Sequence, residues 1–314
     1  MLRLIVGFDR CVSASPGGTS PDLQYEAITG TPSQRVQRNF VRPLGFRWPD
    51  GSVGDMIFRM EVIALQSGSS GNCIYVEAAG MRLLFDAGIS GRQAEQRLAS
   101  FGRDIRDVDA LVISHDHRDH AHAMGIYQRK FGIPIHVTPD TLSVARRKMS
   151  LGALHDVHYF RSGTTLTLGD VRIETIRTPH DAVDGVGFVI DDSAVRLGIL
   201  TDLGHVFDEL DEVVESLDAV VIESNHDPEM LAECFYPESL KRRIRSPRGH
   251  ISNRDAAELL HRSASTRLKW ACLAHLSGES NTAELALDTH RRVLGQRFPI
   301  CCADRGAAID VLAV

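Results

Sequence analysis

The stretch Leu111-Val112-Ile113-Ser114-His115-Asp116-His117-Arg118-Asp119-His120 joins a short apolar run to a segment crowded with imidazoles and carboxylates. The apolar run predicts a strand. Side chains two apart on an extended chain point to the same side, so His115 and His117 are expected to face one volume. Asp119 and His120 follow where the chain is expected to turn toward a helix. Such donors suit zinc and related cations. The stretch therefore predicts a metal-dependent hydrolase, the alternative being a polar surface loop.

Three further donors stand after apolar runs that predict strands. His180 follows the alternating run 171–176 and a short connection, Asp202 follows 197–201, and His275 follows 270–274. A lone histidine is more often a core or surface residue without a ligand role. Here the pattern of an apolar run followed by a donor occurs three times, which favours a functional role. Donors at successive strand ends would line one edge of a sheet. Asp86, after the run 83–85, is either a residue that orients a ligand or a turn aspartate before a glycine.

The elements predicted around these motifs are hairpins, strands and helices. Hairpins are expected over 164–175 and 187–200, and helices over 92–101, 140–149, 253–261 and 282–294. Hairpins followed by strand–helix alternation favour two sheets flanked by helices.

The motifs carry a family resemblance. The string His115-x-His117-x-Asp119-His120, followed in order by His180, Asp202 and His275, resembles the metallo-β-lactamase superfamily. The stretches 67–73, 223–227, 249–253 and 274–277 are similar to its YycJ/WalJ-type branch. The resemblance covers about residues 60–314. It implies an α+β fold, the four-layer αββα sandwich (metallo-β-lactamase fold), with metals at one sheet edge.

The resemblance also implies two divalent metal ions, most simply zinc, with manganese or iron as alternatives. The implied ligands are His115, His117 and His180 for the first metal, Asp119, His120 and His275 for the second, and Asp202 between them. A carboxylate suits the bridge because each oxygen can face one cation. The resemblance also favours the interpretation of Asp86 as a hydrogen-bond acceptor for a ligand imidazole. Asp202 in place of a cysteine disfavours an antibiotic-degrading lactamase, and His117 in place of an acid disfavours a di-iron oxygen reductase.

Two features bear on the substrate. The basic run 241–248 contains Arg242, Arg243 and Arg245 directly before Gly249-His250, so contact with phosphates is expected there. Ser252 or Asn253 is expected to cap the helix that follows, whose free backbone amides could receive a phosphate.

His250 is the candidate general acid, because the superfamily's phosphodiesterases use a similar glycine–histidine motif to protonate the leaving oxygen. Glu223 or His226 would orient it, and Asp119 would orient the attacking hydroxide; the alternative is that His250 only caps the helix. The resemblance implies a 5′-to-3′ DNA exonuclease acting by metal-activated hydroxide attack on phosphorus. The alternatives are an ester or thioester hydrolase of the glyoxalase II type and a non-catalytic nucleic-acid-binding protein.

Composition bounds these expectations. The chain has 314 residues, 43% of them hydrophobic and 24% charged, as in globular proteins with a sizeable core, and it has no apolar stretch of membrane-spanning length. The formal net charge of −6 excludes a global field that attracts nucleic acid. The 6 cysteines include no Cys-x-x-Cys pair, which favours a reducing cytoplasm. A homodimer is left open.

The first part of the chain differs from the rest. Residues 1–55 are rich in Gly, Pro, Ser and Arg and lack a sustained period, so they predict a disordered extension. An alternative is that translation starts at Met56 or Met60 and that the upstream part is mis-annotated. Residues 56–314 are expected to form one metallo-hydrolase domain.

Overall fold

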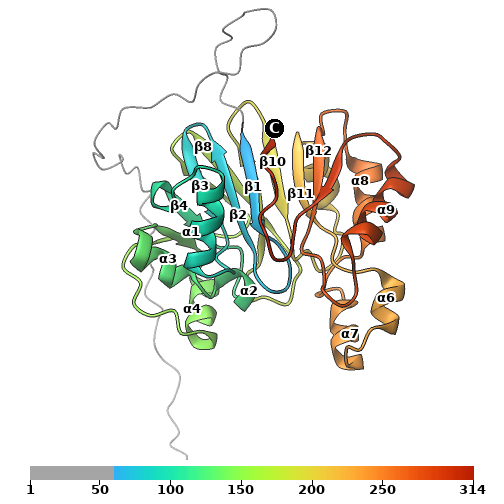
Figure 1. The fold of residues 1–314 in the computed structure, drawn as a ribbon, viewed down its shortest axis with the longest axis horizontal. Coiled ribbons are helices and arrows are strands. Elements are labelled where there is room, and N and C mark those ends of the chain that lie inside the picture. The colour runs from blue at the N-terminus through green and yellow to red at the C-terminus, as the bar shows by residue number, and fades with distance from the viewer. Residues whose placement is uncertain (1–59) are drawn as a thin grey trace, which may run out of the picture. The chain divides into compact units, whose positions relative to one another are not determined.

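The computed structural model describes residues 60–314, which fold into two facing sheets covered by helices (Figure 1). The extension predicted over 1–55 and the alternative start at Met56 lie outside the described residues.

The first sheet is formed by the N-terminal half of the described chain and closed by its last strand. Its order is β14-β1-β2-β3-β4-β5-β6. The bounds are β1 Glu61–Gln66, β2 Cys73–Ala78, β3 Met81–Phe85, β4 Ala110–Val112, β5 Ile135–Val137, β6 Val157–Tyr159 and β14 Leu312–Ala313. The strands from β3 to β6 are parallel, whereas β14, β1, β2 and β3 pair antiparallel.

The second sheet has the order β13-β12-β11-β10-β9-β8-β7. Its bounds are β7 Thr165–Leu168, β8 Val171–Arg177, β9 Val186–Asp191, β10 Arg196–Leu200, β11 Ala219–Glu223, β12 Trp270–Ala274 and β13 Ile300–Cys302. The two predicted hairpins are present as β7–β8 and β9–β10, both antiparallel. The strands from β10 to β13 are parallel, so the ends of β10, β11 and β12 meet at one edge.

The described chain also contains helices, most of which cover the outer faces of the sheets. They are α1 Gly91–Ser100, α2 Arg118–Ala121, α3 Met124–Phe131, α4 Pro139–Lys148, α5 Glu209–Glu215, α6 Pro228–Glu233, α7 Glu238–Ile244, α8 Asn253–Ser263 and α9 Ala283–Leu294, with a 3₁₀ turn at Ile105–Asp107. Side-chain caps fix several starts: Ser90 and Gln93 form a capping box at α1, and Thr138 caps α4 ahead of Pro139. The four predicted helices are therefore confirmed to within a residue or two.

Both faces of each sheet are buried. Three apolar layers therefore separate the two sheets from each other and from the helices on either side. In β1, Val62 and Ala64 pack between the sheets, whereas Ile63 and Leu65 pack against α1, α3 and α4. A third layer lies between the second sheet and α5, α8 and α9. The expected four-layer αββα sandwich is confirmed.

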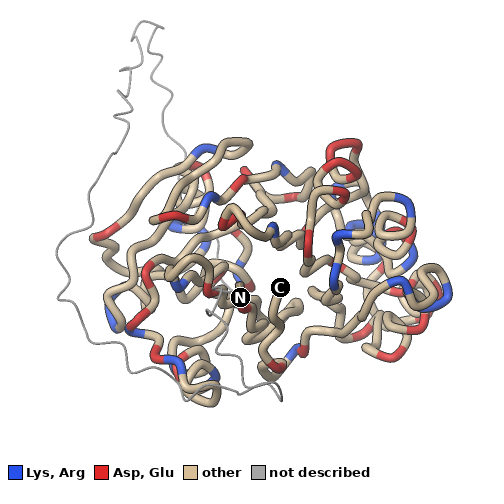
Figure 2. Tube along the Cα trace, turned by 90° about the horizontal axis from the view of Figure 1, so that it is seen from above, with Lys and Arg blue, Asp and Glu red and all other residues tan. Residues whose placement is uncertain are grey.

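Acidic and basic residues are interspersed around the trace rather than gathered on one face (Figure 2). Within residues 60–314, no helix is both long and apolar enough to cross a membrane.

Candidate metal centre

The predicted donors meet where strands of the two sheets end. His180, Asp202 and His275 follow β8, β10 and β12 of the second sheet, and the loop 113–117 with α2 follows β4 of the first. The donor groups brought together are His115, His117 and His180; His115, His120 and Asp202; Asp119, His120 and His275; and Asp202, Glu223, His250 and His275, with ligand atoms within 4.8 Å of one another in each group.

His115 and His117 converge for a different reason from the one predicted. The strand β4 ends at Val112, so both histidines lie in a loop rather than on an extended strand. Their ring centroids are nevertheless 4.6 Å apart. The buried Asp116 between them faces away, accepting hydrogen bonds from Lys148 Nζ and from the Val183 amide at 2.9 Å. This pairing holds the loop while the two rings face the opposite direction.

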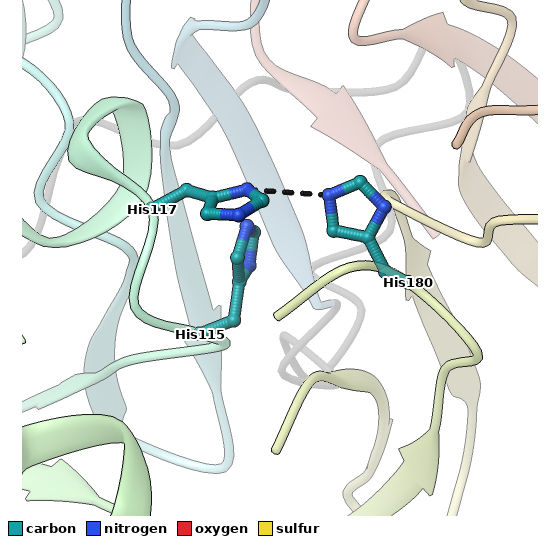
Figure 3. A group of neighbouring side chains, drawn as sticks. All are labelled: His115, His117 and His180. Carbon is teal, nitrogen blue, oxygen red and sulfur yellow. Dashed lines mark hydrogen bonds between the residues drawn. The ribbon is translucent and has the colours of Figure 1, made fainter. Parts of the chain in front are cut away.

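The first group of donors consists of three imidazoles (Figure 3). His180 Nε2 lies 3.2 Å from His117 Nδ1, and His180 Nδ1 donates to the Gly249 carbonyl at 2.8 Å, which leaves the Nε2 lone pair directed at the group. Burial lowers the pKa of His117 to about 4 and lowers those of His180 and His115, the last far below its usual value. These rings are neutral near pH 7 and offer lone pairs.

The second group combines imidazoles with a carboxylate. His120 Nε2 lies 3.5 Å from Asp119 Oδ2, and His275 Nε2 lies 3.4 Å from the same oxygen. Burial alone would lower the pKa of His275, but Asp202, Asp119 and Glu223 raise it to about 10. Burial likewise opposes charge on His120, yet carboxylates raise its pKa well above the usual value. The surroundings of this group therefore favour positive charge.

Asp202 lies between the two groups. Its Oδ1 is 3.6 Å from both His180 Nε2 and His275 Nε2, and its Oδ2 is 3.2 Å from His120 Nε2. Among residues 60–314, Asp202 Oδ2 and His115 Nε2 have no hydrogen-bond partner although both atoms are buried. Buried polar atoms without partners are costly unless something else satisfies them. The neutral imidazoles of the first group, the carboxylates beside the second group and the unsatisfied polar atoms surround one volume and fit a pair of divalent cations.

Asp86 touches the donor set through one ring. Its Oδ2 lies 2.7 Å from His120 Nδ1 and accepts the Ser114 hydroxyl at 2.9 Å, while its Oδ1 accepts the Ser114 amide at 2.8 Å. A carboxylate that accepts the Nδ1 proton fixes the tautomer in which Nε2 is the free nitrogen. Asp86 is thus in contact with a ring of the donor set, and its orienting role stays a prediction.

Three residues at this edge of the sheets have a strained backbone. Asp86, Asp202 and His275 have φ values of 65°, 57° and 56°, and each follows the end of a strand. Left-handed backbone is uncommon for residues other than glycine and clusters at functional sites. Gly88 allows a close approach, since a Cβ there would lie 1.6 Å from the Asp119 carbonyl oxygen.

Glu223, not His226, contacts the candidate acid. Glu223 Oε1 lies 2.7 Å from His250 Nδ1, and its Oε2 accepts the Leu203 amide at 3.0 Å. Burial would raise the pKa of Glu223, but His250 and His275 hold it well below its usual range. The His226 ring makes no hydrogen bond to His250, both being described residues, and its Nδ1 is buried without a partner. Of the two predicted orienting residues, Glu223 is the one in contact with His250.

Two predicted phosphate contacts at the start of α8 are corrected by the structure. The Asn253 side chain is fully buried and bonds to Ser224 and Asn281. Its amide donates to the His226 carbonyl, and Ser252 forms a capping box with Asp255. The backbone amides of Ser252, Asn253 and Asp255 are already hydrogen-bonded, and the Asp255 carboxylate would repel a phosphate. The start of α8 therefore does not present a free phosphate site.

The predicted basic run divides into paired and unpaired residues. Arg243 on α7 forms a two-point salt bridge with Asp181, one contact being 2.9 Å from Nη2 to Oδ1. Asp181 Oδ1 also lies 3.4 Å from His117 Nε2 and from His180 Nε2. All three arginines are exposed, but Arg243 is neutralised by Asp181 beside the donors, whereas Arg242 and Arg245 form no salt bridge among residues 60–314.

Sequence reasoning assigned no role to Asn72. Its Nδ2 lies 2.9 Å from His120 Nε2 and 3.5 Å from Asp119 Oδ2, and its Oδ1 accepts the Gly68 amide at 2.9 Å. The signal was available, because Asn72 belongs to the stretch 67–73 that carries part of the branch resemblance.

Two facing sheets with a histidine–carboxylate cluster at one edge define the class of metallo-hydrolases. The chain belongs to the beta-lactamase superfamily, whose domain matches residues 81–272. Exodeoxyribonuclease WalJ of Streptococcus pneumoniae serotype 2 is 39% identical over 257 residues, covering 81% of this chain and 92% of that protein. Exodeoxyribonuclease YycJ of Bacillus anthracis is 34% identical over 233 residues, covering 74% and 88%. Both the superfamily and the branch resemblance are confirmed.

Solved structures agree on the fold. The metallo-beta-lactamase fold protein YhfI from Bacillus subtilis superimposes with a TM-score of 0.63 at 17% identity, covering 82% of this chain and all of that one. At this identity the likeness supports the architecture alone.

Proposed function

We propose that this protein is a metal-dependent exonuclease that acts on DNA and hydrolyses phosphodiester bonds. Two relatives named exodeoxyribonuclease align with most of the chain, at 39% and 34% identity. The observation that carries the proposal is the gathering of all seven predicted ligands, with Asp202 between the two groups.

The residues proposed to hold two metals are those of the two groups. They are His115, His117 and His180 for one cation, Asp119, His120 and His275 for the other, and Asp202 for both. Zinc is proposed, because imidazole and carboxylate ligands suit it, with manganese and iron as alternatives. When bound, such a pair lowers the pKa of a coordinated water and offsets negative charge on phosphoryl oxygens.

His250 is proposed to deliver the proton that the leaving oxygen needs. Its Nδ1 is held 2.7 Å from Glu223 Oε1, so the opposite nitrogen, Nε2, is available for proton transfer. Glu223 is fully buried and anchored by the Leu203 and Ile251 amides, so it keeps the ring in one orientation.

Asp119 is proposed to orient the attacking water. It is the donor-group carboxylate that is partly exposed, whereas Asp202 and Glu223 are buried, so an incoming water meets Asp119 first. The proposed direction of digestion, 5′ to 3′, follows from the branch resemblance.

One assay tests the function. Full-length protein reconstituted with zinc, manganese or iron is incubated with end-labelled single- and double-stranded DNA, RNA, a simple phosphodiester and a thioester. We expect mononucleotides released progressively from a 5′ end of DNA, and no such release by Asp202→Asn. His261→Ala, at an exposed position on α8, is the matched control and should digest DNA normally. Hydrolysis of the thioester alone would contradict the proposal and favour a glyoxalase II-type hydrolase.

A further inference from the structure

A cavity of about 300 Å³ opens directly beside the donor groups. His180 belongs both to the first donor group and to the wall of this cavity. Residues 177–179 and 182–185, together with Arg248, which precedes Gly249-His250, form the rest of the wall. His180 is therefore the residue that joins this cavity to the first donor group.

Two guanidinium groups in the cavity wall are bonded to neutral oxygens rather than to carboxylates. Arg177 donates from Nε to the Ser162 hydroxyl at 3.0 Å and from Nη2 to the Ser162 carbonyl at 3.1 Å. Arg248 donates from Nη2 to the His180 carbonyl at 3.4 Å. Among residues 60–314, neither forms a salt bridge, in contrast to Arg243, which Asp181 neutralises. Anchoring on neutral oxygens orients these groups without cancelling their charge.

The part of the cavity wall beside the arginines is suited to contact the sugar or base of a nucleotide. Val183 is 49% exposed and gives an apolar surface beside the arginines. One carboxylate, that of Asp184, also lines the cavity, so the ionised wall carries one net positive charge beside His180. The charges elsewhere on the fold are interspersed (Figure 2), so this local excess differs from a general basic surface.

We propose that this cavity is a nucleotide subsite for the strand being digested. In it, Arg177 and Arg248 bind the phosphodiester next to the one that is cleaved, and Val183 contacts the adjoining sugar or base. Guanidinium groups bind phosphate oxygens with charge-assisted hydrogen bonds, and preorganised donors bind with less loss of entropy. The inference rests on the proposed nuclease function and assigns to Arg248 and Arg177 the contact that sequence reasoning expected from Arg242, Arg243 and Arg245.

Binding by the holoenzyme tests the subsite. The probe is a fluorescent single-stranded phosphorothioate oligonucleotide that resists cleavage, titrated over a range of KCl concentrations. Arg177→Ala should weaken binding about tenfold, the low end for a hydrogen bond to a charged group. It should also reduce the slope of log affinity against log salt by about 0.7, which corresponds to one phosphate contact on a single strand. Arg177→Lys keeps the charge and should retain the slope.

The chain offers a matched control. Arg172 is exposed at the other end of the same strand, β8, and Arg172→Ala should bind and digest DNA as the wild type does. For Arg177→Ala and Arg248→Ala, the defect in DNA digestion should appear in KM rather than in kcat, with metal content equal to that of the wild type.

Three outcomes would overturn the inference. Wild-type affinity and salt slope in both alanine variants, with DNA digestion intact, would exclude the subsite and leave the function standing. If Arg177→Ala and Arg248→Ala weakened inhibition by a free 5′-mononucleotide as much as they weakened binding of the oligonucleotide, the cavity would be a product site rather than a contact for the strand. A wild-type holoenzyme that digests no nucleic acid would refute both the function and the subsite.

Discussion

Glu223 holds His250 with one carboxylate oxygen, Oε1, at 2.7 Å from Nδ1, and the same oxygen lies 3.2 Å from His275 Nδ1. A single buried carboxylate thus connects the proposed proton donor with a proposed metal ligand. Proton donation by His250 and metal binding by His275 can be separated experimentally, because only proton donation depends on the leaving group.

Replacing His250 with alanine should affect substrates according to their leaving groups. A DNA sugar oxygen needs a proton as it departs, whereas p-nitrophenolate does not. We expect kcat on DNA to fall about 10²–10⁴-fold, the usual contribution of general acid catalysis, and the rate on a p-nitrophenyl phosphodiester to fall far less. Equal losses on both substrates, at unchanged metal content, would contradict the proton-donor role.

Replacing Asp86 with asparagine should weaken metal binding. Asparagine tolerates the left-handed backbone at this position, but an amide nitrogen in place of Oδ2 cannot accept the His120 Nδ1 proton. We expect an affinity loss of about 10–100-fold, measured by competition with a chelator. Asp208→Asn, at an exposed position before α5, is the control and should bind metal as the wild type does. Normal affinity in Asp86→Asn would remove Asp86 from the orienting role.

Adding a methyl group at Gly88 should displace Asp119. The new Cβ would lie 1.6 Å from the Asp119 carbonyl oxygen, and the backbone there is also bonded to Asn72. We expect Gly88→Ala to lose about 1–3 kcal/mol of stability in urea unfolding and to bind less metal. Gly102→Ala meets no atom within 4 Å, so it should cost only the strain of its positive φ and retain the metal.

His290 should make stability depend on pH. Burial lowers the pKa of this α9 residue to about 4, while the unfolded chain titrates near 6.5. The unfolded state therefore binds more protons between these values, and stability falls as the pH drops from 6.5 toward 4. At pH 5 the loss from His290 is about 2 kcal/mol. His290→Leu should flatten this part of the urea-unfolding profile relative to the wild type, whereas the exposed-site variant His261→Leu should not.

Local patterns were sufficient to predict the strands and most of the donors. An apolar run followed by a donor marked His180, Asp202 and His275, because a strand end is encoded by neighbouring residues. The contacts that sequence reasoning missed join distant segments. Asn72 meets His120 across 48 positions, and Asp181 meets Arg243 across 62. Such pairs join segments that follow different strands, so they depend on the order of strands within each sheet, which no local pattern reports.

The same distinction explains the corrected contacts. Asn253 fits a helix start in the sequence, and it does begin α8, but its side-chain oxygen accepts hydrogen bonds from Ser224 and Asn281, and its backbone amide donates to His226. A cap pattern predicts where a helix begins without indicating which partners have already used its polar groups. Arg243 likewise belongs to a basic run, and only the fold reveals that Asp181 neutralises it.

The left-handed backbone at Asp86, Asp202 and His275 limits which mutations this protein can accept during evolution or redesign. A β-branched or bulky residue at these three positions would be opposed by backbone geometry before its chemistry mattered, whereas asparagine, aspartate, histidine and glycine are admitted. Altering the metal preference by exchanging Asp202 or His275 therefore requires a residue that satisfies both coordination and conformation. Exchanges at His117 or His180, where φ is not positive, face only the first requirement.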